Sequence, residues 1–291
     1  MLNIKKILLP VDFPNASLRV IHQAATLARH FHSEIVMLHV VTPRSHAAGV
    51  PEDAAGLAGW DLLEEVIRRA QEKRDLTLGP ELDGLTIRRV LAKGNPAHAI
   101  VQMAQREKAD LIMMPSYGFT FDQFLLGSVA PKMLHGSECP VWTCAPVEES
   151  PAQDFAIRNV LCAVDFSSHV RKTVSWAKET AVEFGGRLTL ADVTAGVEFW
   201  GPGGNYVNPK WKMALVSDAA QHIADIQHDM GIKTDIFIGS GDVPEVLSLA
   251  AKQTKADLLV IGCRPYGVSL RTHGYAIIRA ARIPVLSVGG P

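Results

Sequence analysis

Cysteine and histidine occur in this chain without any of the spacings that usually hold a metal ion. The 291 residues include four cysteines, none in a Cys-x-x-Cys pair, and eleven histidines without a His-x-x-x-His or His-Glu-x-x-His pattern. Cys162 and Cys263 lie inside apolar runs that are typical of β-strands. The sequence therefore favours buried, reduced thiols over disulfide bonds or a zinc site.

An excess of one charge and a long apolar run are also missing. Lys and Arg number 29 against 30 Asp and Glu, and no basic run occurs, so nothing points to nucleic acid or an anionic membrane as a partner. No stretch reaches the roughly 18 apolar residues of a membrane span. The apolar run in MLNIKKILLPVDF is broken by Pro10 and Asp12 and is too short for a signal peptide. We expect a cytoplasmic protein.

The chain contains two copies of one pattern. The segment IKKILLPVDF that begins at Ile4 matches IRNVLCAVDF from Ile157, and AKGNPAHAIVQMAQREKADLIMMP from Ala92 matches GSGDVPEVLSLAAKQTKADLLVIG from Gly239. The matching segments keep the same order, which indicates a tandem duplication of an ordinary domain rather than a solenoid. The boundary falls in the polar VEESPAQD, so we predict domains at residues 1–148 and 155–291. The short linker favours packing of one domain against the other.

Short apolar strands alternate with helical patterns in each half. In the first half the predicted strands are Ile7–Val11, Ile35–Val41, Leu85–Leu91, Leu111–Pro115 and Val141–Cys144. The predicted helices are Ser17–His30, Leu62–Asp75 and Pro96–Arg106. Strands that are apolar throughout and separated by helices indicate a parallel sheet covered on both faces. The fold class is therefore α/β, with a doubly wound parallel sheet in each half.

Asp12 and Asp165 follow the first strand of their halves, each between a Val and a Phe. Ligands of doubly wound sheets bind beyond the carboxyl ends of the strands, where the strand order reverses. A carboxylate at this place could accept hydrogen bonds from a ribose or base, or help to hold a metal ion. It could equally cap a helix or a turn. The residues alone leave both readings open.

Gly127 and Ser128 follow the fourth predicted strand of the first half and open a predicted helix. A Gly-Ser pair there offers backbone N–H groups, a hydroxyl and the positive end of the helix dipole to phosphate oxygens. Gly118, earlier in the same loop, would let the chain approach a ligand closely. The alternative is an ordinary helix cap.

The whole chain resembles a tandem universal stress protein, from the adenine-nucleotide alpha hydrolase-like superfamily. The segments ILLPVDF and MLHV in the first half, VLCAVDF and LADV in the second, both Lys-Ala-Asp strands, LLGSVAPKMLHGSECPVW and RIPVLSV carry this resemblance. It implies a five-stranded parallel sheet in each half. It also implies ATP as the ligand, with magnesium left open, and pairing of the two halves. Homodimers and a protein partner of unknown identity are further expectations.

The resemblance implies a nucleotide site mainly in the first half. Asp12 would contact the adenosine end, and Val40 would contact adenine through its backbone. Phosphates would be lined by Gly118, Gly127, Ser128 and Val129. This sequence departs from the family pattern of G-x-x-G, nine residues, then G-S/T. Pro115 stands where the first glycine belongs, and only the eight residues 119–126 separate Gly118 from Gly127.

The second half departs in another way. Asp165 and Gly262 occupy the corresponding positions, but no Gly-Ser pair opens its last helix. We therefore expect a weaker site there, or only a structural partner. The aromatic residues of VEFWGPGGNYVNPKWKM, residues 197–213, predict a loop that forms an interface or, alternatively, a lid over a ligand.

Signatures of catalysis are missing. The sequence has no P-loop, no serine nucleophile elbow, no S-G-G-x-D-S loop and no HIGH or KMSKS motif. No residue stands out as the base that phosphoryl transfer needs. The prediction is a non-enzymatic ATP-binding sensor or regulator of a stress response. The alternatives are a scaffold that has lost nucleotide binding, and a slow ATPase.

Overall fold

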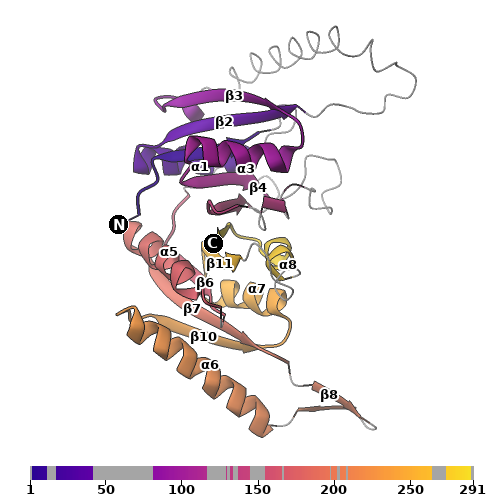
Figure 1. Ribbon diagram of the computed structural model, residues 1–291. Coiled ribbons are helices and arrows are strands. Elements are labelled where there is room, and N and C mark those ends of the chain that lie inside the picture. Colours follow the sequence, from indigo (N-terminus) through magenta and orange to yellow (C-terminus); the bar gives the residue numbers. More distant parts are fainter. Residues whose placement is uncertain are drawn as a thin grey trace, which may run out of the picture.

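In the computed structural model the chain forms one long β-sheet with helices on both faces (Figure 1). It describes residues 2–11, 18–41, 81–116, 129, 132–133, 137–144, 155–165, 167–196, 198–201, 204–207, 209–263 and 273–289. The proposed domain boundary, residues 147–154, and the predicted helix Leu62–Asp75 lie outside these residues. Within them, no helix combines the length and the apolar character needed to cross a bilayer.

Ten strands form one sheet in the order β10-β7-β6-β11-β12-β5-β4-β1-β2-β3. The first half contributes β1 (Lys6–Pro10), β2 (Glu34–Val41), β3 (Ile87–Lys93), β4 (Leu111–Pro115) and β5 (Val141–Cys144). The second half contributes β6 (Asn159–Ala163), β7 (Arg187–Thr194), β10 (Asp235–Ser240), β11 (Leu258–Cys263) and β12 (Val285–Gly289). Within each half, every pairing in this ten-stranded sheet is parallel. This confirms the predicted fold class of two repeated parallel five-stranded units.

The two units join edge to edge. β5 and β12 pair antiparallel, with Thr143 opposite Val285 and Val141 opposite Ser287. Each of these strands would otherwise be an open sheet edge, with unpaired N–H and C=O groups that invite association. Pairing them satisfies both edges and makes one continuous sheet of the two units. Because this single pairing is antiparallel, the carboxyl ends of the two sets of strands lie at opposite edges of the sheet.

The helices divide between the two faces of the sheet. They are α1 (Leu18–Phe31), α3 (Pro96–Glu107), α5 (Val170–Glu183), α6 (Pro209–Asp229), α7 (Val243–Gln253) and α8 (His273–Ala280). α1, α5 and α6 share one apolar core that runs across both halves. On the other face, α3 covers the first half, while α7 and α8 cover the second, each over a core of its own. The halves therefore share a core on one face only.

Local sequence explains why α3 and α7 begin where they do. The Asn95 side chain accepts a hydrogen bond from the His98 backbone N–H (3.3 Å), and Asp242 accepts one from Glu245 N–H (3.2 Å). These residues are N-caps, which satisfy backbone donors that the first helical turn leaves without a partner. A proline follows each cap within the first turn, where its missing N–H costs nothing.

The aromatic segment 197–213 differs from its prediction as a single loop. Glu198–Gly201 (β8) and Gly204–Val207 (β9) form an antiparallel hairpin, with Phe199 opposite Tyr206, and α6 already begins at Pro209. In Figure 1 this hairpin stands apart from the large sheet, between β7 and α6. Gly201 and Gly204 lie opposite each other at the end of this hairpin, so glycine marks a hairpin here rather than a long loop.

Candidate functional site

The strand order creates one crevice in each half. β1 lies between β2 and β4, so the chain crosses to one side after β1 and later returns on the other. β6 lies in the same way between β7 and β11. Ligands of open α/β sheets bind at such reversal points, outside the carboxyl ends of the strands. The candidate sites are therefore at the ends of β1 and β4 and, at the opposite edge of the sheet, of β6 and β11.

Two of the predicted first-half site residues lie among the described residues. Val40, near the end of β2, is half-buried and lies opposite Ala92 of β3. Val129 is also half-buried, and both valines pack against the core under α3. The structure thus brings these two residues, far apart in sequence, to one apolar cluster. Asp12, Gly118, Gly127 and Ser128 lie outside the described residues.

Hydrogen bonds hold the strand ends of the first crevice in place. Val11 N–H donates to Leu38 C=O at 2.8 Å, and His39 Nδ1 lies 2.9 Å from Val11 C=O. Beyond β4, both the backbone N–H and the hydroxyl of Ser116 donate to Cys144 C=O, at 3.0 and 2.8 Å. These bonds tie the chain to its neighbouring strands at the points where it leaves the sheet. They give the crevice a rigid base.

Pro115 and Gly262 occupy equivalent positions in the two halves, but their surroundings differ. Pro115 is the last residue of β4, and as a proline it has no backbone N–H group that could donate a hydrogen bond. A Cβ on Gly262 would lie 3.0 Å from Thr173 Oγ1, which is tighter than an ordinary van der Waals contact. The buried Thr173 of α5 therefore occupies the space beside Gly262. Packing against α5 is sufficient reason for a glycine there.

Asp165 takes part in a local turn. Its Oδ1 accepts a hydrogen bond from the Ser167 backbone N–H at 3.0 Å. It is not the N-cap of α5, because that position belongs to His169, which makes no side-chain cap bond. Of the two readings left open by the sequence, the structure gives direct support to the turn, by an Asx-type bond that ties the chain after β6.

A buried carboxylate near this edge was missed by the sequence analysis. Asp192 of β7 is only 5% exposed, and its Oδ2 lies 3.5 Å from Nδ1 of His222 on α6. Burial raises the pKa of Asp192, the His222 imidazole opposes this effect, and the charge of Asp165 adds to it. At 3.5 Å the two atoms are too far apart for a well-formed hydrogen bond. An aspartate inside the apolar run LTLADVT was the only signal in the sequence.

The four cysteines are free thiols, three of them buried and Cys139 partly so. Burial raises the pKa of Cys139 and of Cys144 to about 12, and that of Cys263 to about 11. Burial also raises the pKa of Cys162. A protonated thiol is a poor nucleophile and a poor metal ligand at neutral pH. The cysteines therefore act as small core residues. The described part of the chain also contains no cluster of three or more His, Cys, Asp or Glu side chains placed to hold a metal ion.

Comparison with known families matches the model of the universal stress protein family twice, over residues 3–144 and 156–289. The chain belongs to the universal stress protein family. The two matches agree with the tandem repeat, since each covers one five-stranded unit of this universal stress protein.

Individual relatives match one half of the chain or all of it. A universal stress protein of Methanocaldococcus jannaschii is 32% identical over 140 residues, which are 47% of this chain and 79% of the relative. The crystal structure of a universal stress protein from Archaeoglobus fulgidus covers 99% of this chain and 97% of its own, with a TM-score of 0.71 at 20% identity. That similarity supports the fold of the whole tandem chain.

A further universal stress protein structure is a complex with cAMP. It covers 50% of this chain and 98% of its own, at 21% identity and a TM-score of 0.33.

Proposed function

We propose that this chain is a cytoplasmic stress-response protein that binds ATP in the crevice of its first half and acts as a sensor or regulator. The observation that carries the proposal is the arrangement around β1. β2 and β4 flank β1, and in the sequence Asp12 follows β1 while Gly118, Gly127 and Ser128 follow β4. The resemblance of these residues to the family's nucleotide motif supports ATP as the ligand.

The described surroundings suit an adenine base. Val40 is a half-buried apolar residue over the α3 core. An uncharged planar ring can be buried against such a surface, whereas a phosphate cannot without losing its hydration. Phosphates would instead take the backbone N–H groups of Gly118, Gly127 and Val129 and the Ser128 hydroxyl. The Asp12 carboxylate would accept hydrogen bonds from the adenosine hydroxyls.

The second crevice is less suited to a nucleotide. Asp165 already accepts a bond from Ser167, and Thr173 lies against Gly262. The buried Asp192 adds a second carboxylate near this edge. An ionised carboxylate repels a polyphosphate. We therefore assign binding to the first half.

Mass spectrometry of nucleotide released from the freshly purified, denatured protein tests the proposal, together with thermal shift against ATP with and without Mg²⁺ and against cAMP. ATP at about 100 times its dissociation constant should stabilise the fold by about 2.7 kcal/mol. Gly127→Val and Ser128→Glu should abolish the response while circular dichroism stays unchanged. Asp12→Asn should weaken the response, and the matched Asp165→Asn in the second half should not.

Other outcomes would identify the alternatives. No bound nucleotide and no thermal shift would reject the proposal and leave a scaffold, with Pro115 and the shortened glycine loop as the reason. ATP turnover that requires both Mg²⁺ and Asp12 would make the protein an ATPase instead of a sensor. An equal loss of response in Asp12→Asn and Asp165→Asn would contradict the assignment to the first half.

A further inference from the structure

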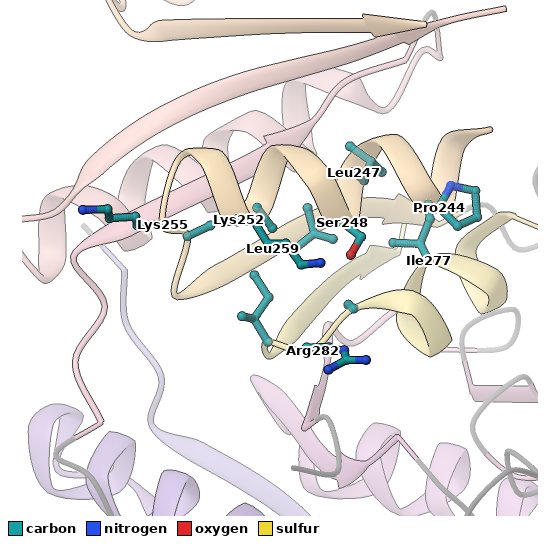
Figure 2. Close-up of a pocket in the computed structure, with 12 residues that line it drawn as sticks. Pro244, Leu247, Ser248, Lys252, Lys255, Leu259, Ile277 and Arg282 are labelled. Carbon is teal, nitrogen blue, oxygen red and sulfur yellow. The ribbon is translucent and has the colours of Figure 1, made fainter. Parts of the chain in front are cut away.

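A groove opens on the outer face of the second half, between α7 and the end of α8, over β11 (Figure 2). Its volume is about 260 Å³. The floor is apolar and well buried: Leu247 and Leu259 are each 1% exposed and Ile277 is 5% exposed. This surface is separate from the crevices at the strand ends, so binding in the groove does not depend on the proposed nucleotide site.

Three cations border this apolar floor. Lys252 and Lys255 come from α7 and the residues just after it, and Arg282 comes from the segment after α8. All three are exposed. Among the residues that the structure describes, no carboxylate lines the groove and none forms an ion pair with any of the three cations. Their positive charge is therefore not neutralised locally. Figure 2 shows Lys252 and Arg282 on the two sides of the groove.

The first half contains the equivalent groove with a different charge. Ser248, Ala251, Lys252, Lys255 and Ala256 align in the repeat with Val101, Ala104, Gln105, Lys108 and Ala109, and the latter five line a groove of about 320 Å³ beside α3. Here Gln105 replaces Lys252, and Glu138 replaces Arg282. Among the described residues that line it, Lys108 is the single cation, against the carboxylates of Asp110 and Glu138. The positive border is thus a property of the second half and not of the fold.

The size and charge of the groove restrict what can occupy it. Pockets for whole small molecules usually enclose about 300–1,000 Å³, so 260 Å³ suits a few inserted side chains of a larger partner better. Recognition of an anionic membrane usually takes about four to eight Lys or Arg together, and this border has three. An apolar floor with charged flanks matches an amphipathic segment laid into a groove.

We propose that the groove formed by α7 and α8 binds a segment of a partner protein in which apolar anchor side chains are flanked by Asp or Glu. The anchors cover Leu247, Leu259 and Ile277, and the carboxylates pair with Lys252, Lys255 and Arg282. Charge complementarity of this kind sets specificity and the association rate.

Selection of displayed random peptides on the full-length protein tests this proposal. Counter-selection uses Lys252→Gln/Arg282→Glu, which gives the second groove the residues of the first. Enriched peptides should combine apolar residues with Asp or Glu. In fluorescence anisotropy their synthetic forms should bind the double variant about tenfold or more weakly. Their binding should also weaken with added salt.

Lys255 allows a cleaner test of charge. Lys255 and Lys108 both adopt φ 52°, a left-handed conformation that glycine tolerates better than lysine, so Lys→Gly removes the charge without straining the helix end. Lys255→Gly should weaken peptide binding severalfold, and the matched Lys108→Gly should leave it unchanged.

Several results would overturn the proposal. These are enriched peptides without acidic residues, peptides that bind the double variant as well as the wild type, and a selection that enriches none. If the protein binds phosphatidylserine vesicles and the double variant does not, the groove binds a membrane rather than a protein segment. If sedimentation velocity shows self-association that the double variant loses, the groove binds a second copy of the chain.

Discussion

Where β5 and β12 pair at the centre of the sheet, the two halves place different side chains at equivalent positions of the repeat. In the first half Trp142 of β5 donates from Nε1 to Oε1 of Gln23 on α1, at 2.9 Å. Cys144 Sγ lies 2.8 Å from the same oxygen. In the second half the repeat places Leu286 on β12, Trp176 on α5 and Val288 at the position of Cys144. The indole comes from the strand in one half and from the helix in the other.

The same positions of the repeat therefore hold side chains of different type and hydrogen-bonding need. A buried indole N–H requires an acceptor, and Gln23, which is 3% exposed, supplies it. Leu286 has no polar group that needs a hydrogen-bond partner, so α5 can carry the aromatic Trp176 at the position of Gln23. Trp142 and Leu286 are also direct partners across the antiparallel strand pair. The two solutions therefore meet at the junction of the halves.

The largest effect is expected from Trp142→Ala. It removes a buried indole ring at the junction together with the Nε1–H that donates to Gln23, so the free energy of unfolding should fall by about 3–5 kcal/mol. Leu286→Ala, the matched change in the second half, should cost about 2–4 kcal/mol, because a smaller and purely apolar side chain is lost. Urea denaturation of both variants measures the difference. Equal losses would show that the hydrogen bond at Trp142 is not significant.

A smaller loss is expected from Gln23→Met, which keeps the volume and removes the acceptor. The buried Trp142 N–H then has no partner, at a cost of about 1–3 kcal/mol in urea denaturation. Adding Trp142→Phe removes the orphaned donor and should recover part of that loss. If Trp142→Phe were equally costly in both backgrounds, the two side chains would not be coupled.

One carboxyl group in each half has a shifted pKa, lowered for Glu107 and raised for Asp192, and Asp192 supplies the next prediction. The pKa of Asp192 is raised by burial, so the folded protein holds this proton at pH values where the unfolded chain has lost it. Its contribution therefore makes stability fall as pH rises above about 4, the ordinary value for Asp. His222 on α6 and Asp165 beyond β6 are the other titratable groups that act on it.

Asp192→Asn removes this contribution. The stability of the variant relative to the wild type should increase from pH 4 to pH 7 in urea denaturation, and the exposed Asp218→Asn on α6 is the control. A relative stability that does not change with pH would show that Asp192 titrates like an exposed aspartate.

The smallest effect is expected in the first half, from Glu107→Gln. Glu107 pairs with Arg88 and with Lys6 (3.2 Å), and Glu34 completes the network through Arg88 Nε (3.0 Å). The hydrogen bond from Arg88 lowers the pKa of Glu107, so its contribution is present at neutral pH and is lost as pH falls through that lowered pKa. The variant should lose about 1 kcal/mol or less at pH 7, less still in high salt, and nothing at low pH.

The second half lacks this ion network, since Asn159, Arg187 and Thr254 replace Lys6, Glu34 and Glu107 in the repeat. Arg187 donates from Nε to Asn159 Oδ1 at 3.2 Å. Arg187→Gln should therefore show no loss that depends on pH between pH 4 and 7. A loss similar to that of Glu107→Gln would contradict the expected difference between the halves.

Sequence patterns located most strands of the first half because their burial is uniform. β4 and β5 were predicted to the residue, since both are apolar runs with clear polar or proline borders at Asp110 and Pro140. β3 was displaced by two residues at each end, from Leu85–Leu91 to Ile87–Lys93. It is an edge strand with mostly exposed side chains, so its apolar pattern is weak.

The sequence by itself determined the α/β class, the tandem repeat and the positions after β1 and β6 where aspartates stand. These follow from periodicity and self-similarity, which are local properties of a chain. Only the tertiary structure decided that β5 and β12 join the halves into one sheet with crevices at opposite edges. It alone brought Asp192 to His222 and Gln23 to Trp142, and placed Lys252 and Arg282 on the two sides of one groove. Such arrangements join residues that are distant in sequence, and no local pattern specifies which distant side chains will lie together.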